Sequence, residues 1–501
     1  MWVHSVDRLL AENIARNSNS RRHNCSVYRI PPFIRNLRPQ CYDYNVIPLG
    51  LYNRDFRNVT PMVQLELEVV AIFFKHLNLQ PDVDGWNTFC RDLGMSPRDG
   101  TTLENFYHEL PSDSSITPNM GLSVLVIDAV FIAAICVRAL VGPRYADNPP
   151  GFVSDILEIF DRSSVGCYFL SFLSDVGMVF ENQVPLYMLQ NVWGKISHMI
   201  GRSFERCLQV TVGEIILNLL PIPTVMSYYD SFEFESCTHM LECVHRAVIL
   251  DTSSTSAAVP SRSRVHYYTR YINKHMRRLM ISPLLVVTRF LKSPVERDTN
   301  VAATRRLTPR TLPTVAELRK AGIRFRGVQT SLCGIRFEKS FFNFRATLNL
   351  PQLEFSDVTE RLLLNLCAFE LMRVPHQERR VTAFVSVMDE LISTEEDVHL
   401  LREGPEPVIS ANLLRENKRV ADLFDNILQN FVYSNLVLVD LDEVINDLHA
   451  WNDARWRHQV THFIDRFVTA PWIFVTMVAA TLLLSVTIGQ TVYTVLGFYH
   501  S

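Results

Sequence analysis

The sequence lacks the motifs that mark the common enzyme classes. It has no Gly-x-Ser-x-Gly elbow, no His-Glu-x-x-His pair, no phosphate-binding Gly-x-x-x-x-Gly-Lys loop and no Gly-x-Gly-x-x-Gly fingerprint. We therefore predict no catalytic, cofactor-binding or metal-binding residues, and we expect a protein that is not an enzyme.

A charge excess and paired cysteines are also missing. The net charge is −3, which indicates no general affinity for polyanions. None of the ten cysteines forms a Cys-x-x-Cys pair, and Cys136, Cys207 and Cys367 lie within apolar helical patterns. Such usage is typical of a reducing compartment. The basic N-terminus, residues 1–26, has no continuous apolar stretch, so we predict a flexible arm without a signal peptide.

The body, residues 27–467, is predicted to be mainly helical. Hydrophobic residues make up 48% of the chain, enough for a large core. Residues 323–350 alternate as strands do, which predicts a small antiparallel β meander, and 252–264 predict a linker. Helical spacing of apolar residues is found at 61–79, 122–141, 153–162, 166–181, 186–200, 207–219, 233–250, 312–322, 359–393, 395–403, 417–432 and 440–467.

The segment 122–141 is apolar for about five turns and could in principle cross a membrane. It carries Asp128 and Arg138, however, and each charge near the centre of a span would cost about 2.5–3.5 kcal/mol. We therefore predict a buried central helix here.

The C-terminal segment, by contrast, contains no Asp, Glu, Lys or Arg between residues 472 and 499. We predict a single transmembrane helix over 471–499, because this length exceeds the ~30 Å hydrocarbon core at ~1.5 Å per residue. Trp472 at one end, with Tyr493 and Tyr499 at the other, would lie in the aromatic belts and anchor the helix in lipid. The alternative is a C-terminal helix buried in the core.

The flanks of this segment predict its orientation. Arg455, Arg457 and Arg466 precede it and no Lys or Arg follows it, so the positive-inside rule places the body in the cytoplasm, most simply at the plasma membrane. Thr481, Ser485 and Gly489 recur every four residues and form a candidate helix-pairing face for a homo-oligomer.

Cysteine and histidine are concentrated in CTHMLECVH, residues 237–245. Four such side chains in nine residues resemble a zinc site. At ~100° per residue only His239 and Cys243 share a helix face, so we predict a packed amphipathic helix without metal.

FENQVPLYMLQ, residues 180–190, interrupts an apolar pattern with Glu181, Asn182 and Gln183 just before Pro185. We predict that these polar side chains satisfy open helix ends at a buried joint, where Pro185 starts a new helix. The alternative is an enzyme with an unrecognised site built around Glu181 as general acid or base.

Basic residues outnumber acidic ones in 262–326, where tyrosines are interleaved with arginines. Stacking and phosphate contacts could use them, so a nucleic-acid-binding protein is a further alternative. A solvated face paired with acidic helices is favoured, and we expect no nucleic-acid partner.

Seven segments, in order along the chain, resemble a plant family known as domain of unknown function 247, also grouped among uncharacterised plant membrane proteins. The Glu-Asn-Gln-x-Pro signature is the most specific of them. Leu51, Asn53 and Ala129 depart from the family pattern, which has Pro, His and Gly there. The segments are VYRIPPFIR (27–35), IPLGLYNRD (47–55), LVIDAVFI (125–132), FENQVPLYML (180–189), LPTVAELRKAGIRFR (312–326), LLLNLCAFE (362–370) and PWIFVTMVAATLLLSVTIGQTVYTVLGFY (471–499).

The resemblance implies a helical body with a C-terminal membrane helix, and it supplies no activity, cofactor or catalytic residue. Some grass members are implicated as pollen-side determinants of self-incompatibility. We therefore expect a membrane-anchored, non-enzymatic recognition or signalling protein, with a self-incompatibility protein as a candidate partner. Its specificity would lie in the loops 92–119 and 252–264.

Overall fold

The computed structural model describes fifteen stretches of the chain. The arm 1–26, the linker 252–264 and the span anchors Trp472, Tyr493 and Tyr499 lie outside them. The described residues are 27–36, 38–54, 60–95, 103, 106–108, 117–141, 149, 151–219, 234, 236–250, 312–339, 346–428, 439–453, 476 and 479–491.

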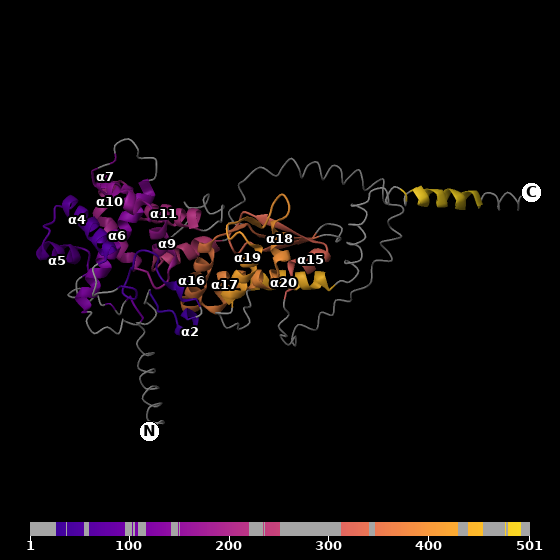
Figure 1. Cartoon of the computed structure of the whole chain (residues 1–501), viewed down its shortest axis with the longest axis horizontal. Helices are drawn as coiled ribbons and strands as arrows, with labels where there is room; N and C mark the ends of the chain where they lie inside the picture. The colour runs from indigo at the N-terminus through magenta and orange to yellow at the C-terminus, as the bar shows by residue number, and fades with distance from the viewer. Residues whose placement is uncertain are drawn as a thin grey trace, which may run out of the picture. The chain divides into compact units, whose positions relative to one another are not determined.

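The described part of the chain is mainly helical, as predicted (Figure 1). Its N-terminal half contains helices only. They are α2 (Pro32–Arg35), α3 (Pro39–Tyr42), α4 (Pro61–His76), α5 (Val83–Asp92), α6 (Pro118–Val141), α7 (Gly151–Asp161), α8 (Ser163–Gly166), α9 (Phe169–Met178), α10 (Leu186–Ile200), α11 (Phe204–Leu219) and α12 (Met240–Ile249).

Helix α6 is the centre of this half. It packs against α4, α7, α9, α10 and α11, and almost every residue from Leu122 to Val141 is buried. It is the one helix of the described residues that is long and apolar enough to cross a membrane, but 83% of its most apolar 18-residue stretch is buried inside the protein. The prediction of a buried central helix is confirmed, because the neighbouring helices shield its apolar surface in place of lipid.

The C-terminal half combines helices with short strands. Its elements are α15 (Val315–Lys320), β1 (Ile323–Val328), β2 (Arg336–Lys339), β3 (Ala346–Pro351), β4 (Leu353–Phe355), α16 (Asp357–Arg373), η8 (His376–Glu378), α17 (Arg380–Leu391), α18 (Glu395–Arg402), β5 (Ile409–Asn412), α19 (Asn417–Leu428) and α20 (Val439–Asn452).

The predicted antiparallel meander at 323–350 is wrong in its topology. The three strands are there, but β3 is central, β1 pairs with it in parallel and only β2 pairs with it antiparallel. Strand periodicity predicts which residues form strands but not which strands become neighbours. A second sheet, in which β4 and β5 pair in parallel, was not predicted.

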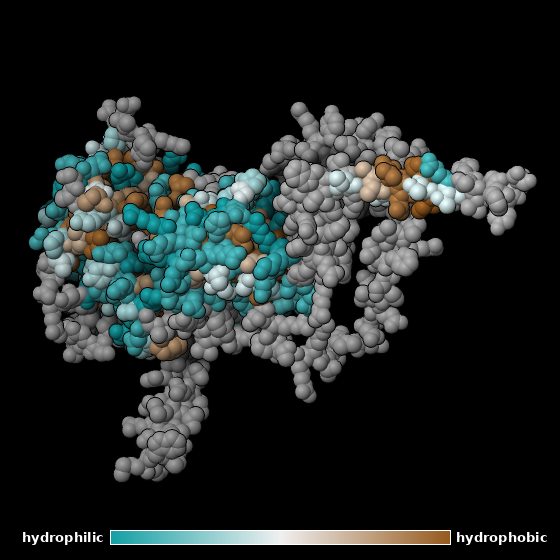
Figure 2. Space-filling model, turned by 45° about the vertical axis from the view of Figure 1, so that its right-hand side comes forward, coloured by the Kyte–Doolittle hydropathy of each residue, from teal (hydrophilic) through white to brown (hydrophobic). Residues whose placement is uncertain are grey.

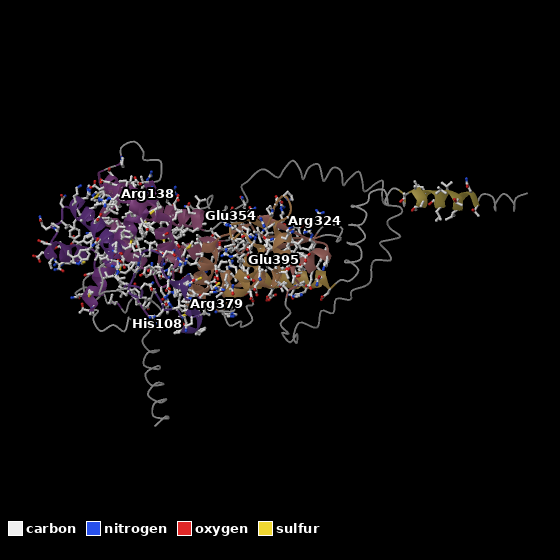
Figure 3. All side chains as sticks on the ribbon, viewed as in Figure 1. His108, Arg138, Arg324, Glu354, Arg379 and Glu395 are labelled. Carbon is white, nitrogen blue, oxygen red and sulfur yellow. The ribbon has the colours of Figure 1, made fainter. Side chains whose placement is uncertain are left out.

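Several helix boundaries also differ from the prediction. The helix expected at 233–250 begins only at Met240, after an N-cap at His239. The helical periodicity within 359–393 corresponds to two helices, α16 and α17, which Pro375 separates. Arg379 (Figure 3) donates to the carbonyls of Leu371 and Val374 at the end of α16.

The described part of the tail is the helix Ala479–Thr491, here called the tail helix. Its apolar side chains are exposed, with Leu482, Leu483 and Leu484 each more than 60% accessible. Figure 2 shows this apolar surface in brown, whereas the visible face of the body is mainly hydrophilic.

Candidate functional site

The Glu-Asn-Gln signature lies in the turn between α9 and α10. Helix α9 ends at Met178, and Pro185 is the N-cap residue of α10, where its missing N–H breaks no helical bond. Glu181, Asn182 and Gln183 are each at most 2% exposed as whole residues. Three consecutive buried polar side chains must each find partners, because an unpaired one would cost about 1–3 kcal/mol.

Glu181 holds the first family segment against the body. Its carboxylate accepts a hydrogen bond from the backbone N–H of Ile30 at 2.7 Å and forms an ion pair with Arg35. Burial raises the pKa of Glu181, and the Arg35 guanidinium opposes this shift.

Asn182 holds the second family segment. Its Oδ1 accepts the N–H of Leu49 at 2.7 Å, and its Nδ2 donates to the carbonyls of Ile47 and Asp175, both at 3.1 Å. Asn53, which stands where the family has His, donates to the same Oδ1 at 3.3 Å. The departure at Asn53 therefore keeps a donor at this position.

The side chain of Gln183 binds open backbone groups at the end of helix α9 and at the start of α12. Its Nε2 donates to the carbonyls of Val176 at 2.9 Å and Val179 at 2.8 Å, and its Oε1 accepts the N–H of Leu241 at 3.0 Å. These are open groups at a helix C-terminus and a helix N-terminus, as the sequence predicted. The signature is a buried joint.

Two more acidic side chains bind the same irregular segment. The Asp175 carboxylate accepts the N–H groups of Asn45, Val46 and Ile47 at 2.7–3.0 Å. The Asp128 carboxylate accepts the N–H of Gly50 at 2.8 Å. Gly50 has φ +69°, and a Cβ there would lie 2.6 Å from the hydroxyl of Tyr107, so only glycine fits.

Arg54 joins Asp128 to helix α4. Its guanidinium pairs with Asp128 and with both oxygens of Glu66, at 2.8 and 2.7 Å, and all three side chains are almost completely buried. One guanidinium neutralises only one of the two carboxylates. Burial, reinforced by Asp128, therefore raises the pKa of Glu66 to about 8.

The joint extends into the C-terminal half through α16. Asn365 accepts the N–H of Phe180 at 2.9 Å and donates to the carbonyl of Cys41 at 2.8 Å. Glu370 accepts from the ring of His245 at 2.8 Å, and also from the N–H of Val381 and the N–H and hydroxyl of Thr382. Buried carboxylates and amides thus connect segments more than 100 residues apart.

The Cys-x-His cluster at 237–245 has separate partners. The ring of His239 caps α12 by accepting the N–H of Glu242 at 3.2 Å, and burial lowers its pKa to about 4, so it is neutral. His245 faces Glu370, and Cys243 is buried beside Cys237. Among the described residues, no group of three or more His, Cys, Asp or Glu side chains is placed to hold a metal ion.

A family model described as "Plant protein of unknown function", domain of unknown function 247, matches residues 27–486. The chain belongs to this family. It is also similar to a UPF0481 protein of Arabidopsis thaliana, with 22% identity over 358 residues; the match covers 62% of this chain and 65% of that protein's length. No solved structure matches the chain.

Five of the seven segments that resemble domain of unknown function 247 are brought together by this network. Residues 27–35 meet Glu181, residues 47–54 meet Asn182 and Asp128, and residues 362–370 meet Phe180 and His245. The sequence predicted the buried joint at 181–183. It did not predict the roles of Asp175 and Glu66. Asp175 binds irregular backbone and Glu66 binds an arginine, and neither lies in a recognisable motif.

Other predicted site residues lie elsewhere. The described part of the basic stretch, 312–326, pairs with acidic residues: Arg319 with Glu403 at 2.6 Å, and Arg326 with Glu406 at 2.8 Å. The expectation that the basic stretch binds no nucleic acid stays a prediction. Residues 262–311 and most of the loops 92–119 and 252–264 lie outside the described residues.

Proposed function

We propose that the chain is a membrane-held recognition protein that docks partners and carries out no catalysis. The observation that carries the proposal is the exposed tail helix. Its apolar side chains from Leu482 to Ile488 are 56–70% accessible, and a contiguous apolar surface of this kind needs lipid or another apolar partner.

The segment around the tail helix supports a membrane span. Residues 472–499 contain no formally charged side chain, and at ~1.5 Å per residue they would form a helix of about 42 Å. The hydroxyls of Ser485, Thr487 and Thr491 each donate to the carbonyl four residues earlier, at 2.7–2.8 Å. Their polarity is therefore satisfied within the helix, as a lipid environment demands.

The buried joint supports the non-catalytic part of the proposal. Glu181 is engaged by Ile30 and Arg35, and its role is to hold the chain in place. The same holds for Asp175, which accepts three backbone N–H groups. These carboxylates bind backbone rather than converging on a site where a substrate could sit.

Orientation is tested by protease protection on sealed vesicles, with different epitope tags at the two ends of the chain. The arginines before the span predict that the body faces the cytoplasm. Protease added outside inside-out vesicles should then remove the N-terminal tag and spare the C-terminal one. The opposite pattern would overturn the cytoplasmic assignment.

The specific form of the proposal is a pollen-side self-incompatibility determinant, the role to which the family resemblance points. Exchange of residues 92–119 and 252–264 between two alleles should then transfer the choice of partner, because loops on a rigid scaffold set specificity. Partner choice that stays with the rest of the chain would contradict the loop assignment.

A further inference from the structure

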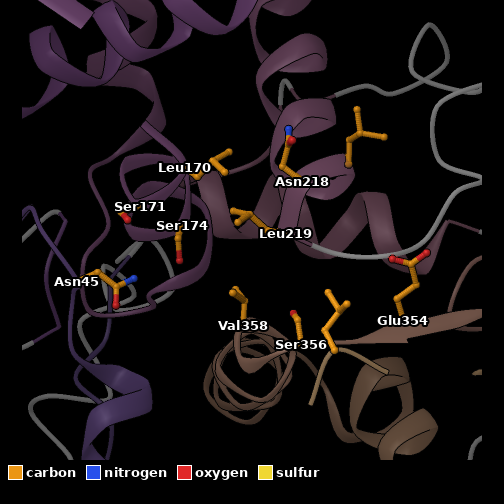
Figure 4. Close-up of a pocket in the computed structure, with 11 residues that line it drawn as sticks. Asn45, Leu170, Ser171, Ser174, Asn218, Leu219, Glu354, Ser356 and Val358 are labelled. Atoms are coloured by element: carbon orange, nitrogen blue, oxygen red, sulfur yellow. The ribbon is translucent and has the colours of Figure 1, made fainter. Parts of the chain in front are cut away.

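A hollow of about 330 Å³ lies between the two halves of the described body (Figure 4). Helices α9 and α11 form one wall, and β4 and the start of α16 form the other. The volume is that of about ten water molecules in the liquid, enough for one bulky side chain and part of its backbone. Its lining is Asn45, Leu170, Ser171, Ser174, Leu217, Asn218, Leu219, Glu354, Ser356, Val358 and Leu413.

The rim of this hollow is unusually apolar for a protein surface. Leu170 and Leu217 are each 49% exposed and Leu413 is 68% exposed, and they come from three different elements. Single exposed leucines are ordinary, but three around one hollow form a patch. An occupant small enough to fit inside would leave them in water, so the rim fits a chain that extends beyond the hollow.

Glu354 is the only charged residue of the lining, and Figure 3 marks it. Its carboxylate forms no hydrogen bond or ion pair with the described residues. An occupant without a positive charge would leave this carboxylate partly dehydrated and unpaired, which is costly. The charge of the hollow is therefore complementary to a cation.

Polar groups able to bind an extended backbone lie across the hollow from the acid, on the side of Asn45 and Ser171 (Figure 4). The side chains of Asn45 and Ser171 make no hydrogen bond with the described residues, and Asn45 is held in place by its own N–H, which donates to Asp175 at 2.7 Å. Side-chain amides and hydroxyls offer both donors and acceptors to a peptide.

We propose that this hollow is a peptide-docking site, which takes a bulky apolar side chain next to a lysine or arginine from a partner protein. The inference rests on the proposed recognition function and names the surface that performs it. The apolar side chain contacts Leu170, Leu217 and Leu413, and the basic side chain forms an ion pair with Glu354.

The test is selection of a phage-displayed random heptapeptide library on the full chain in lipid nanodiscs. Wild type should enrich peptides in which Leu, Ile or Phe adjoins Lys or Arg. Glu354→Lys should shift the enrichment to Asp or Glu while keeping the apolar residue, and Glu354→Gln should remove the charge preference. Glu158→Lys, an exposed charge reversal on α7, should select the wild-type peptides.

Affinity of the best wild-type peptide provides the second readout. Leu413→Ser should weaken it about tenfold, because it removes apolar surface that contacts the peptide at the rim of the hollow, whereas Leu67→Ser on α4, 47% exposed, should leave it unchanged. The proposal would be overturned if wild type enriched no peptide or if Glu354→Lys selected the same peptides as wild type. It would also be overturned if Leu413→Ser abolished self-association of the chain, because a second copy would then be the occupant. The membrane anchorage of the chain is measured separately, so these failures leave that claim intact.

Discussion

The buried joint makes a quantitative prediction about Asn182. Replacement by alanine removes three hydrogen bonds to backbone groups of Leu49, Ile47 and Asp175, at 2.7–3.1 Å in a fully buried site. It also removes the longer one that Asn53 donates, at 3.3 Å. Each partner left unsatisfied costs about 1–3 kcal/mol. We expect Asn182→Ala to lower the free energy of unfolding by about 3–5 kcal/mol.

The expected thermal shift follows from the size of the protein. At about 2.1 cal/mol/K per residue, the roughly 300 described residues of the body give an unfolding entropy near 0.6 kcal/mol/K. The Tm of Asn182→Ala should therefore fall by about 5–8 °C in differential scanning fluorimetry of the full chain in detergent.

A matched control uses a partly exposed asparagine. Asn191 donates one hydrogen bond, to the carbonyl of Leu93 at 3.0 Å. Its replacement by alanine should cost about 1 kcal/mol, which lowers the Tm by about 2 °C. If the two variants melt at the same temperature, the signature does not hold the fold together as described, and the role of residues 181–183 must be sought elsewhere.

Three further predictions concern charge, the C-terminal half and helix pairing. Because the pKa of buried Glu66 is raised in the folded state, the folded chain retains a proton that the unfolded chain releases. This stabilisation is full below about pH 4.5 and is lost as pH rises through about 8, so the Tm of Glu66→Gln should rise relative to wild type between about pH 4.5 and pH 8; a constant difference would refute the assignment. Glu370→Ala should cost about 4 kcal/mol by leaving the N–H groups of Val381 and Thr382 unpaired, seen as a Tm loss that the exposed Glu378→Ala does not share. A Cβ added at Gly489 has no atom of the same chain within 4 Å, so Gly489→Ile should leave the fold intact. If Thr481, Ser485 and Gly489 form a helix-pairing face, the substitution should reduce crosslinked dimers. Undiminished crosslinking would show that this face does not pair helices.

Local chemistry made several elements predictable from the sequence. Pro61 starts α4 after the N-cap Thr60, and α10 spans the predicted residues 186–200, ending at Gly201 in the left-handed conformation. Apolar periodicity also located the buried helix α6. These features depend on neighbours within a few residues, which the sequence displays directly.

Long-range partners were not predictable in the same way. The parallel pairing of β1 with β3 depends on the path of the chain between them, which strand periodicity does not encode. In the sequence, Asp175 and Glu66 are indistinguishable from other helix residues, yet each binds a residue outside its own helix: Asp175 binds Val46, and Glu66 binds Arg54. The lining of the hollow runs from Asn45 to Leu413, so no local motif marks it.

The central claim is that the tail helix lies in lipid and holds the body at a membrane. Alkaline carbonate washing of vesicles carrying the full chain tests it most directly, beside a Leu483→Lys, Val486→Asp double variant whose charges would cost about 5–7 kcal/mol in a bilayer. The account predicts that the wild-type chain stays in the vesicle pellet and that the double variant is released. Release of the wild-type chain would contradict it.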